Sequence, residues 1–311
     1  MNIFNDQNKA ILDYFLDGLM SRYQERVPYV GSIIKDMIKV GMIRRIDDIE
    51  NDHIAFRTMG VKNLGVNSLE KIFLKVGYQR KDEYIFDKKK LKAYWYSPPV
   101  AKYPRIFISE LLVDDLDQDS QRIIRSYTDE VKQDPVTQLN LDSGEEINEF
   151  LHKPLWRIPS LDDYQKLAAI SEYASWVIYN RYYLNHFTIS VHNLPEEFNT
   201  IDLFNQFLKK RGYKLNDSGG EIKVSDDGLL LQSSTVSNMI DAEFADDSGA
   251  SVTSRISGSY VEFAERKILD SFASISLDKI TREHRRDGFD IDNANNIFES
   301  TYSNQTNKLN Q

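Results

Sequence analysis

Two stretches of this sequence begin in the same way: residues 51–58 read NDHIAFRT, and residues 185–192 read NHFTISVH. Each places a histidine at the start of an alternating run that is typical of a β-strand. Side chains two residues apart share one face of a strand, so His53 and Arg57 are expected on the same polar face. His186 begins the second run in the equivalent position, and we expect it to face the same interior.

The elements that follow each histidine recur in the same order. After the first strand the sequence predicts a helix, a Gly-Tyr stop and three further strands, twice along the chain. The interval from the histidine to the Gly-Tyr stop is 24 residues in the first unit and 26 in the second. Self-similarity at this scale indicates a duplicated supersecondary unit. The sequence thus predicts an α+β fold in which two β-α-β-β-β modules, 50–113 and 184–266, pack as a pseudo-dimer around a cupped sheet.

Helical and polar segments surround the two modules. Within one structural domain we expect a helical amino-terminal segment (1–49), the first module (50–113), a helical insertion (114–183), a second module with a carboxy-terminal extension (184–290) and a polar tail that frays (291–311).

Composition narrows the class of protein. The 311 residues carry a formal net charge of −9, which disfavours nonspecific binding to nucleic acid or to an anionic membrane. The chain has no cysteine, so disulfides, thiolate metal sites and thiol nucleophiles are excluded. Its amino terminus lacks the features of a signal peptide, and its apolar runs are too short to span a membrane. We therefore expect a cytoplasmic protein without a nucleic-acid or membrane partner, in an oligomeric state that the sequence does not fix.

The last strand of each module carries a glutamate. Matching RIFISEL with SYVEFAER places Glu110 opposite Glu262, and Glu262 has apolar neighbours among which an unpaired carboxylate is costly to bury. Two imidazoles and one carboxylate that meet in a cupped sheet form the facial triad typical of Fe(II) oxygenases, although zinc and manganese could bind the same donors. The sequence therefore predicts His53, His186 and Glu262 as ligands of a metal ion.

Arg57 and Glu110 are further candidates for catalysis. The guanidinium of Arg57 stays protonated and cannot bind a metal, but it can bind a substrate carboxylate beside one. A structural salt bridge is the alternative for Arg57. Glu110 could be a fourth ligand, an acid on the substrate side or a structural carboxylate.

Motifs along most of the chain resemble the 2-oxoadipate dioxygenase/decarboxylase family, nonheme iron enzymes of lysine catabolism related to the vicinal oxygen chelate superfamily. The resemblance runs from about residue 20 to residue 302, on DHIAFRT, RIFISEL, NHFTISVH, SYVEFAER and RRDGFDIDNANNIFEST. The family's iron ligands fall on His53, His186 and Glu262, and its substrate-binding arginine falls on Arg57. Bacterial members carry additional carboxy-terminal sequence, and we expect the metal site not to depend on that segment.

The resemblance implies a reaction and a cofactor. A 2-oxo acid would bind Fe(II) at the triad beside dioxygen, and 2-oxoadipate would be converted to 2-hydroxyglutarate and CO2. Two alternatives use the same residues. One is a zinc- or manganese-dependent isomerase, lyase or hydrolase on the same scaffold, because a fold does not decide a chemistry. The other is a noncatalytic protein that binds a dicarboxylate through Arg57.

Overall fold

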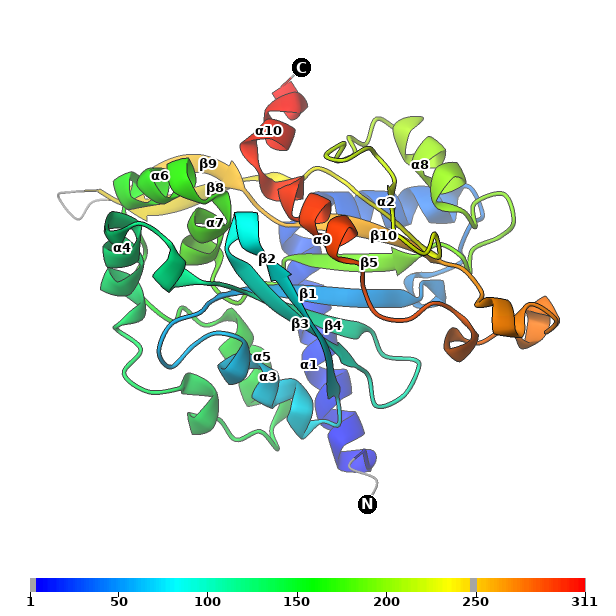
Figure 1. Cartoon of the computed structure of the whole chain (residues 1–311), viewed down its shortest axis with the longest axis horizontal. Helices are drawn as coiled ribbons and strands as arrows, with labels where there is room; N and C mark the ends of the chain where they lie inside the picture. The colour runs from blue at the N-terminus through cyan, green and yellow to red at the C-terminus, as the bar shows by residue number, and fades with distance from the viewer. Residues whose placement is uncertain (1–3, 247–250, 311) are drawn as a thin grey trace.

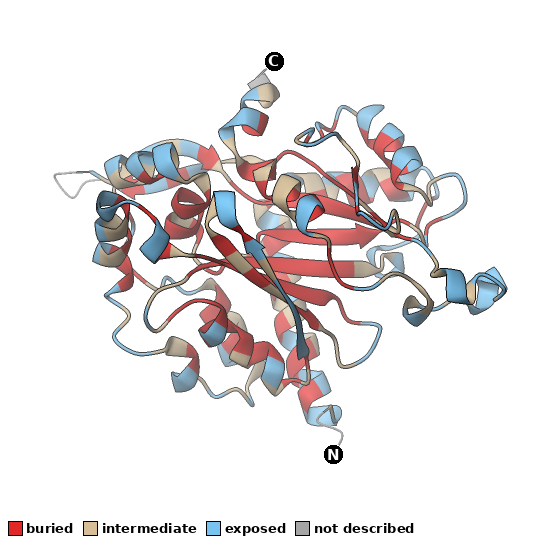
Figure 2. Ribbon diagram, in the orientation of Figure 1, coloured by how far each residue is buried: buried red, intermediate tan, exposed pale blue. Residues whose placement is uncertain are grey.

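The computed structural model describes residues 4–246 and 251–310 (Figure 1). Its centre is an eight-stranded sheet in the order β2-β3-β4-β1-β5-β10-β7-β6, and β8 and β9 form a separate hairpin. The central strands β4, β1, β5 and β10 are buried, whereas the edge strand β2 is mostly exposed (Figure 2). The predicted α+β fold with two modules in one curved sheet is confirmed.

Each module contributes four strands and one helix to this architecture. The first consists of β1 (Asn51–Met59), α3 (Val66–Lys75), β2 (Gln79–Phe86), β3 (Leu91–Ser97) and β4 (Arg105–Leu111). The second consists of β5 (His186–Ser190), α8 (Ile201–Lys209), β6 (Lys223–Val224), β7 (Leu230–Ser234) and β10 (Tyr260–Arg266). The hairpin of β8 (Met239–Ala245) and β9 (Ser251–Ser257) is inserted before β10, and the sequence did not predict it.

The two modules join through their first strands. β1 pairs with β5 in antiparallel fashion, and Ala55 lies opposite His186. Within each module the first strand runs parallel to the last, β1 with β4 and β5 with β10. This arrangement places the first strands of both modules side by side at the middle of the sheet.

Helices cover both faces of the sheet. The amino-terminal helices are α1 (Asp6–Arg26) and α2 (Pro28–Lys39), and the insertion forms α4 (Gln118–Thr128), α5 (Gly144–His152), α6 (Leu161–Ile170) and α7 (Glu172–Asn180). Figure 1 shows α1 behind the central strands, where the hydroxyl of Tyr23 donates to the carbonyl of Tyr260. Within the described ranges, no helix combines the length and apolarity needed to cross a bilayer.

Residues 291–310 form helices and helical turns, so the expectation of a fraying tail is wrong for the described part of this segment. They form α9 (Ile291–Ile297), a 3-10 turn (Phe298–Thr301) and α10 (Ser303–Thr306). Phe298 and Thr301 are buried, and both accept hydrogen bonds from Arg57 of β1. The polar composition was misleading because the polar groups of this segment are paired inside the protein rather than hydrated.

Strand register corrects the predicted match between Glu110 and Glu262. The histidine that opens each module lies opposite Arg105 in β4 and opposite Tyr260 in β10. Glu262 lies two positions after Tyr260, whereas Glu110 lies five positions after Arg105, so the two glutamates are not equivalent. The alignment of the two strands by residue type was wrong because backbone pairing, not residue type, sets the register of a strand.

The counterpart of Glu110 is Glu265, and the two carboxylates have the same role. Glu110 Oε2 accepts a hydrogen bond of 2.8 Å from the backbone N–H of Val66, the first residue of α3. Glu265 Oε2 accepts one of 2.8 Å from the N–H of Ile201, the first residue of α8. A carboxylate in this position pairs an N–H that the helix leaves free and interacts favourably with the helix dipole. The duplication therefore extends to how each module fixes its helix to its last strand.

We expect Glu265→Ala to lower the free energy of unfolding by about 1–2 kcal/mol, because the first amide of α8 loses its acceptor. Urea unfolding of the purified variant measures this change. Glu197→Ala, which truncates an exposed glutamate in the loop before α8, is the matched control and should change stability by less than about 0.5 kcal/mol. Equal effects of the two substitutions would contradict the capping role.

Candidate metal centre

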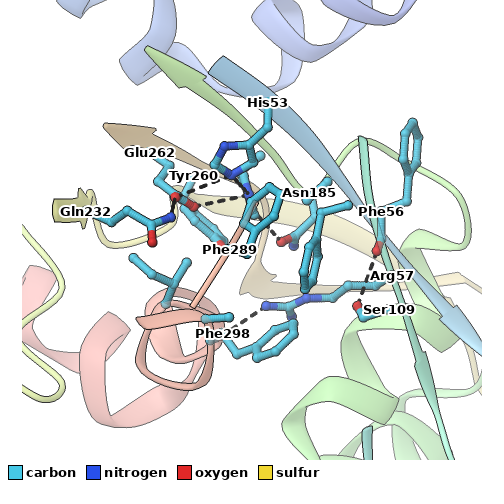
Figure 3. A pocket seen from close by; sticks show the side chains of 15 residues that line it. His53, Phe56, Arg57, Ser109, Asn185, Gln232, Tyr260, Glu262, Phe289 and Phe298 are labelled. Carbon is cyan, nitrogen blue, oxygen red and sulfur yellow. Dashed lines mark hydrogen bonds and ion pairs between the residues drawn. The ribbon is translucent and has the colours of Figure 1, made fainter. Parts of the chain in front are cut away.

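The side chains of His53, His186 and Glu262 meet at the centre of the sheet, and Figure 3 shows two of them, His53 and Glu262. The Nε2 atoms of the two histidines are 3.3 Å apart. Glu262 Oε1 lies 3.4 Å from Nε2 of His53, and Oε2 lies 3.1 Å from Nε2 of His186. All three residues are buried, and they come from the adjacent strands β1, β5 and β10. The antiparallel contact between β1 and β5 thus assembles the site from both modules.

The separations between these donor atoms suit a shared metal ion. Imidazole nitrogen and carboxylate oxygen bind transition metals at about 2.0–2.2 Å, so donors at neighbouring coordination positions lie about 3.0–3.5 Å apart. One ligand atom from each of the three residues lies within 4.8 Å of the other two. The donor set fits Fe(II), and it also fits zinc or manganese. The geometry therefore indicates a divalent metal without choosing among these ions.

Neighbouring side chains orient both histidines. Nδ1 of His53 lies 2.8 Å from Oδ1 of Asp52, and Nδ1 of His186 lies 3.1 Å from Oδ1 of Asn185. An acceptor at Nδ1 favours the tautomer whose proton sits there, which leaves the Nε2 lone pair free for a metal. Both imidazoles are thus held with Nε2 toward the triad.

Burial and nearby charges move the pKa values of the two histidines in opposite directions. Burial lowers the pKa of His186 well below its ordinary value, and the charges of His53 and Arg57 act in the same sense. Burial also acts to lower the pKa of His53, but the charge of Glu262 and the hydrogen bond to Asp52 outweigh it and raise that pKa. His186 therefore offers a neutral ligand, whereas a proton on His53 would have to leave when a metal binds.

Arg57 lies in the same pocket as the triad, as strand alternation predicted. Its Nη1 donates to Thr301 Oγ1 at 2.9 Å and its Nη2 to the carbonyl of Phe298 at 3.0 Å, while Nε has no partner among the described residues. The guanidinium carbon lies 5.1 Å from the ring centres of Tyr173 and Trp176. No carboxylate of the described chain forms a salt bridge with this buried cation. The alternative of a structural salt bridge is therefore not what the structure shows, and the charge is available to an anion.

The pocket between the triad and Arg57 is narrow, with a cavity volume of about 20 Å³, close to the space that one water molecule needs. Four phenylalanines line it: Phe56, Phe107, Phe289 and Phe298. Asn185 Nδ2 and the hydroxyl of Tyr260 are buried there without a partner in the described part of the chain. Figure 3 shows His53 and Glu262 at one end of this pocket and the guanidinium of Arg57 at the other.

Gln232 of β7 is a site residue that sequence reasoning missed. Its Nε2 donates to Glu262 Oε1 at 2.6 Å, and its Oε1 accepts from Asn293 Nδ2 at 3.0 Å. Gln232 therefore orients the carboxylate of the triad and links it to α9. The strand GLLLQSS contained this residue, but its pattern did not distinguish Gln232 from the neighbouring polar residues.

Glu110 lies outside the pocket that holds the triad. Its Oε1 pairs with Lys92 Nζ at 2.9 Å, and its other oxygen caps α3. These are the contacts of a structural carboxylate, one of the alternatives that the sequence left open. His192, in the turn after β5, accepts a hydrogen bond of 3.2 Å from the backbone of Arg266 and does not line the pocket.

Curated plant proteins are similar to most of this chain. A protein of Arabidopsis thaliana named "2-oxoadipate dioxygenase/decarboxylase, chloroplastic" is 42% identical over 296 residues, which cover 91% of this chain and 75% of that protein. A protein of Oryza sativa subsp. japonica named "2-oxoadipate dioxygenase/decarboxylase, chloroplastic/amyloplastic" is 44% identical over 270 residues, covering 83% and 71%.

These names contradict the expectation of a cytoplasmic location, because they place both relatives in plastids. That expectation considered only secretion and membrane insertion, and neither test addresses import into an organelle.

Solved structures agree with the fold. The structure of the hydroxyglutarate synthase from Oryza sativa in complex with 2-oxoadipate has a TM-score of 0.87 and 38% identity, and covers 98% of this chain and 96% of that one. A glyoxalase superfamily protein from Ralstonia eutropha has a TM-score of 0.69 at 19% identity over 88% of this chain and 83% of that one, a likeness of fold alone. A sequence profile of the family described as 2-oxoadipate dioxygenase/decarboxylase matches residues 15–276. With that match and the identity to the plant proteins, the chain belongs to the 2-oxoadipate dioxygenase/decarboxylase family.

Proposed function

We propose that this protein is an Fe(II)-dependent dioxygenase/decarboxylase that converts 2-oxoadipate and dioxygen to 2-hydroxyglutarate and CO2. The observation that carries the proposal is a buried His-His-Glu triad that shares one pocket with a guanidinium lacking a carboxylate partner. The similar rice protein, whose structure contains 2-oxoadipate, supports this choice of substrate.

The charged groups at the two ends of the pocket suit a molecule with an acidic group at each end, which would enter as the lining side chains move apart. The 2-oxo acid group of the substrate would lie at His53, His186 and Glu262, and its second carboxylate would lie at Arg57. A buried guanidinium binds a carboxylate strongly because both charges are removed from water. The unpaired Nε of Arg57 is the donor that such a carboxylate would find free.

Fe(II) bound by His53, His186 and Glu262 would supply open coordination positions and the electrons with which dioxygen reacts. The proposed reaction balances without another reductant. The C1–C2 bond of the 2-oxo acid breaks, C1 leaves as CO2, and both atoms of dioxygen enter the product. One oxygen becomes part of the new carboxylate and the other becomes the hydroxyl group.

Other residues of the chain would hold the substrate and exclude water. Burial raises the pKa of Tyr260 well above its ordinary value, so its hydroxyl remains a hydrogen-bond donor that faces the pocket. Asn185 Nδ2 is a second free donor. The rings of Phe107, Phe289 and Phe298 keep the site dry, which strengthens ionic contacts inside it and limits side reactions.

Oxygen uptake tests this function directly. Anaerobically purified protein, reconstituted with Fe(II), should consume one dioxygen for each CO2 and each 2-hydroxyglutarate formed from 2-oxoadipate, and ¹⁸O₂ should label two oxygen atoms of the product. A chelator should abolish uptake. Turnover of the substrate by the zinc or manganese form without oxygen uptake would instead indicate an isomerase, lyase or hydrolase. Thermal stabilisation by 2-oxoadipate without turnover by any metal form would indicate a binding protein.

Substitutions should separate metal binding from substrate binding. We expect His186→Ala and Glu262→Ala to reduce bound iron sharply, because each removes a ligand. Arg57→Gln should retain iron but raise KM at least 100-fold, since a buried charged hydrogen bond is worth about 3 kcal/mol or more. Metal analysis and steady-state kinetics measure the two effects. Full iron retention in the first two variants would refute the triad, and an unchanged KM in the third would refute the role of Arg57.

A further inference from the structure

A cluster of four charged side chains adjoins His53 on its Nδ1 side: the buried Asp52, Arg105 and Arg266, and the exposed Asp287. Arg266 binds Asp52 with two hydrogen bonds, from Nε to Oδ2 at 2.6 Å and from Nη2 to Oδ1 at 2.9 Å. Arg105 donates to Asp52 Oδ2 at 3.3 Å and to Asp287 Oδ1 at 2.5 Å. Asp52 is 0% exposed and both arginines are 1% exposed. The formal charges of the cluster cancel.

Among its described residues, the second module has no equivalent cluster, although the two modules share their fold. Asn185 precedes His186 where Asp52 precedes His53, and it presents a neutral amide oxygen to the imidazole. The strand registers show that the positions equivalent to the two arginines are uncharged: Tyr260 and Leu111.

Stability alone does not explain this difference between the modules. Replacing a buried ion cluster by neutral groups is often neutral or stabilising, because the desolvation of charges is costly. The second module orients its histidine with a neutral partner. In the first module, Arg266 and Arg105 instead donate hydrogen bonds to the two oxygens of Asp52. The arginines thus provide charged partners for a carboxylate directly behind one imidazole.

We propose that Asp52 is a positioning residue of the metal centre, whose carboxylate holds His53 in the tautomer that directs the Nε2 lone pair toward the metal. This inference rests on the proposed function. A carboxylate can only accept a hydrogen bond, so the imidazole must carry its proton on Nδ1. An anionic partner also makes the imidazole a stronger ligand. The shorter contact, 2.8 Å at His53 against 3.1 Å at His186, is the difference expected for a charge-assisted bond.

The same cluster fixes the pocket wall that faces His53. Arg266 Nη1 donates to the carbonyls of Arg286 at 3.1 Å and Gly288 at 2.8 Å. The next residue, Phe289, packs its ring edge-on against the imidazole of His53, with ring centres 4.7 Å apart. The metal ligand and the aromatic wall therefore have a common anchor in the Asp52–Arg266 pair.

An asparagine cannot replace Asp52 in this geometry. Both carboxylate oxygens accept hydrogen bonds, one from His53 and Arg266 and the other from Arg266 and Arg105. Asparagine has one acceptor oxygen. If its amide nitrogen faces Arg266, two donors oppose each other. If it faces His53, the imidazole must accept at Nδ1 and carry its proton on Nε2, where it cannot bind a metal.

The test compares two variants that share one change in the cluster. Arg105→Gln retains the contact between Asp52 and His53, whereas the double variant Asp52→Asn/Arg105→Gln removes the carboxylate and leaves the cluster's charge balanced. We expect the single variant to bind Co(II) like the wild type and the double variant to bind it about 10–100-fold more weakly. Competition with a chelator, followed by the visible absorption of bound Co(II), measures affinity and coordination together. Circular dichroism verifies folding.

Equal Co(II) affinities and equal spectra of the two folded variants would overturn the proposal. A second measurement does not depend on the folding of any variant. In the zinc-loaded wild type, the Nδ1 proton of His53 should resonate further downfield than that of His186, because its acceptor is charged. Equal shifts would also overturn the proposal. If the wild type binds neither Co(II) nor zinc, the proposed metal centre itself has failed, which distinguishes that outcome from an error about Asp52.

Discussion

The antiparallel pairing of β1 with β5 is the contact on which the site depends. It brings the first strands of two duplicated modules together, so that imidazoles 133 residues apart in sequence approach to 3.3 Å. β10, which runs parallel to β5, then adds the carboxylate of Glu262. A shift of this pairing by one residue would turn the ligands to the opposite face of the sheet, because side chains alternate along a strand. The strand register in the core therefore also determines where the metal ligands lie.

Burying this many charges requires that they be paired, and the chain pairs them in two ways. Permanent charged partners neutralise some of them, as Arg266 and Arg105 do for Asp52. Other charges have incomplete contacts in the protein alone, above all the guanidinium of Arg57. The first group fixes geometry, whereas the second supplies the charge that a metal ion and an anionic substrate would neutralise. The proposed activity follows from this division.

The repeat made much of the fold and the triad predictable from the sequence. Equivalent histidines at the starts of equivalent strands indicated a shared site, and alternation placed Arg57 beside it. The sequence did not reveal the register of the last strand of each module, so Glu110 was matched with Glu262 although its counterpart is Glu265. The polar segment after Asp290 was expected to fray, because composition does not show that its polar groups find partners in the core. Asp52 and Gln232 were missed because their role lies in contacts that a linear pattern does not contain.

Crystals grown anaerobically with Fe(II) and 2-oxoadipate would test the central claim most directly, through anomalous scattering at the iron absorption edge. A single peak bonded to His53 Nε2, His186 Nε2 and one oxygen of Glu262 is expected. The 2-oxo acid group of the substrate should complete the coordination, with its far carboxylate on Arg57. Iron bound elsewhere, or the substrate oriented with neither end at Arg57, would contradict the claim that this duplicated sheet builds one site for a metal and a dicarboxylate.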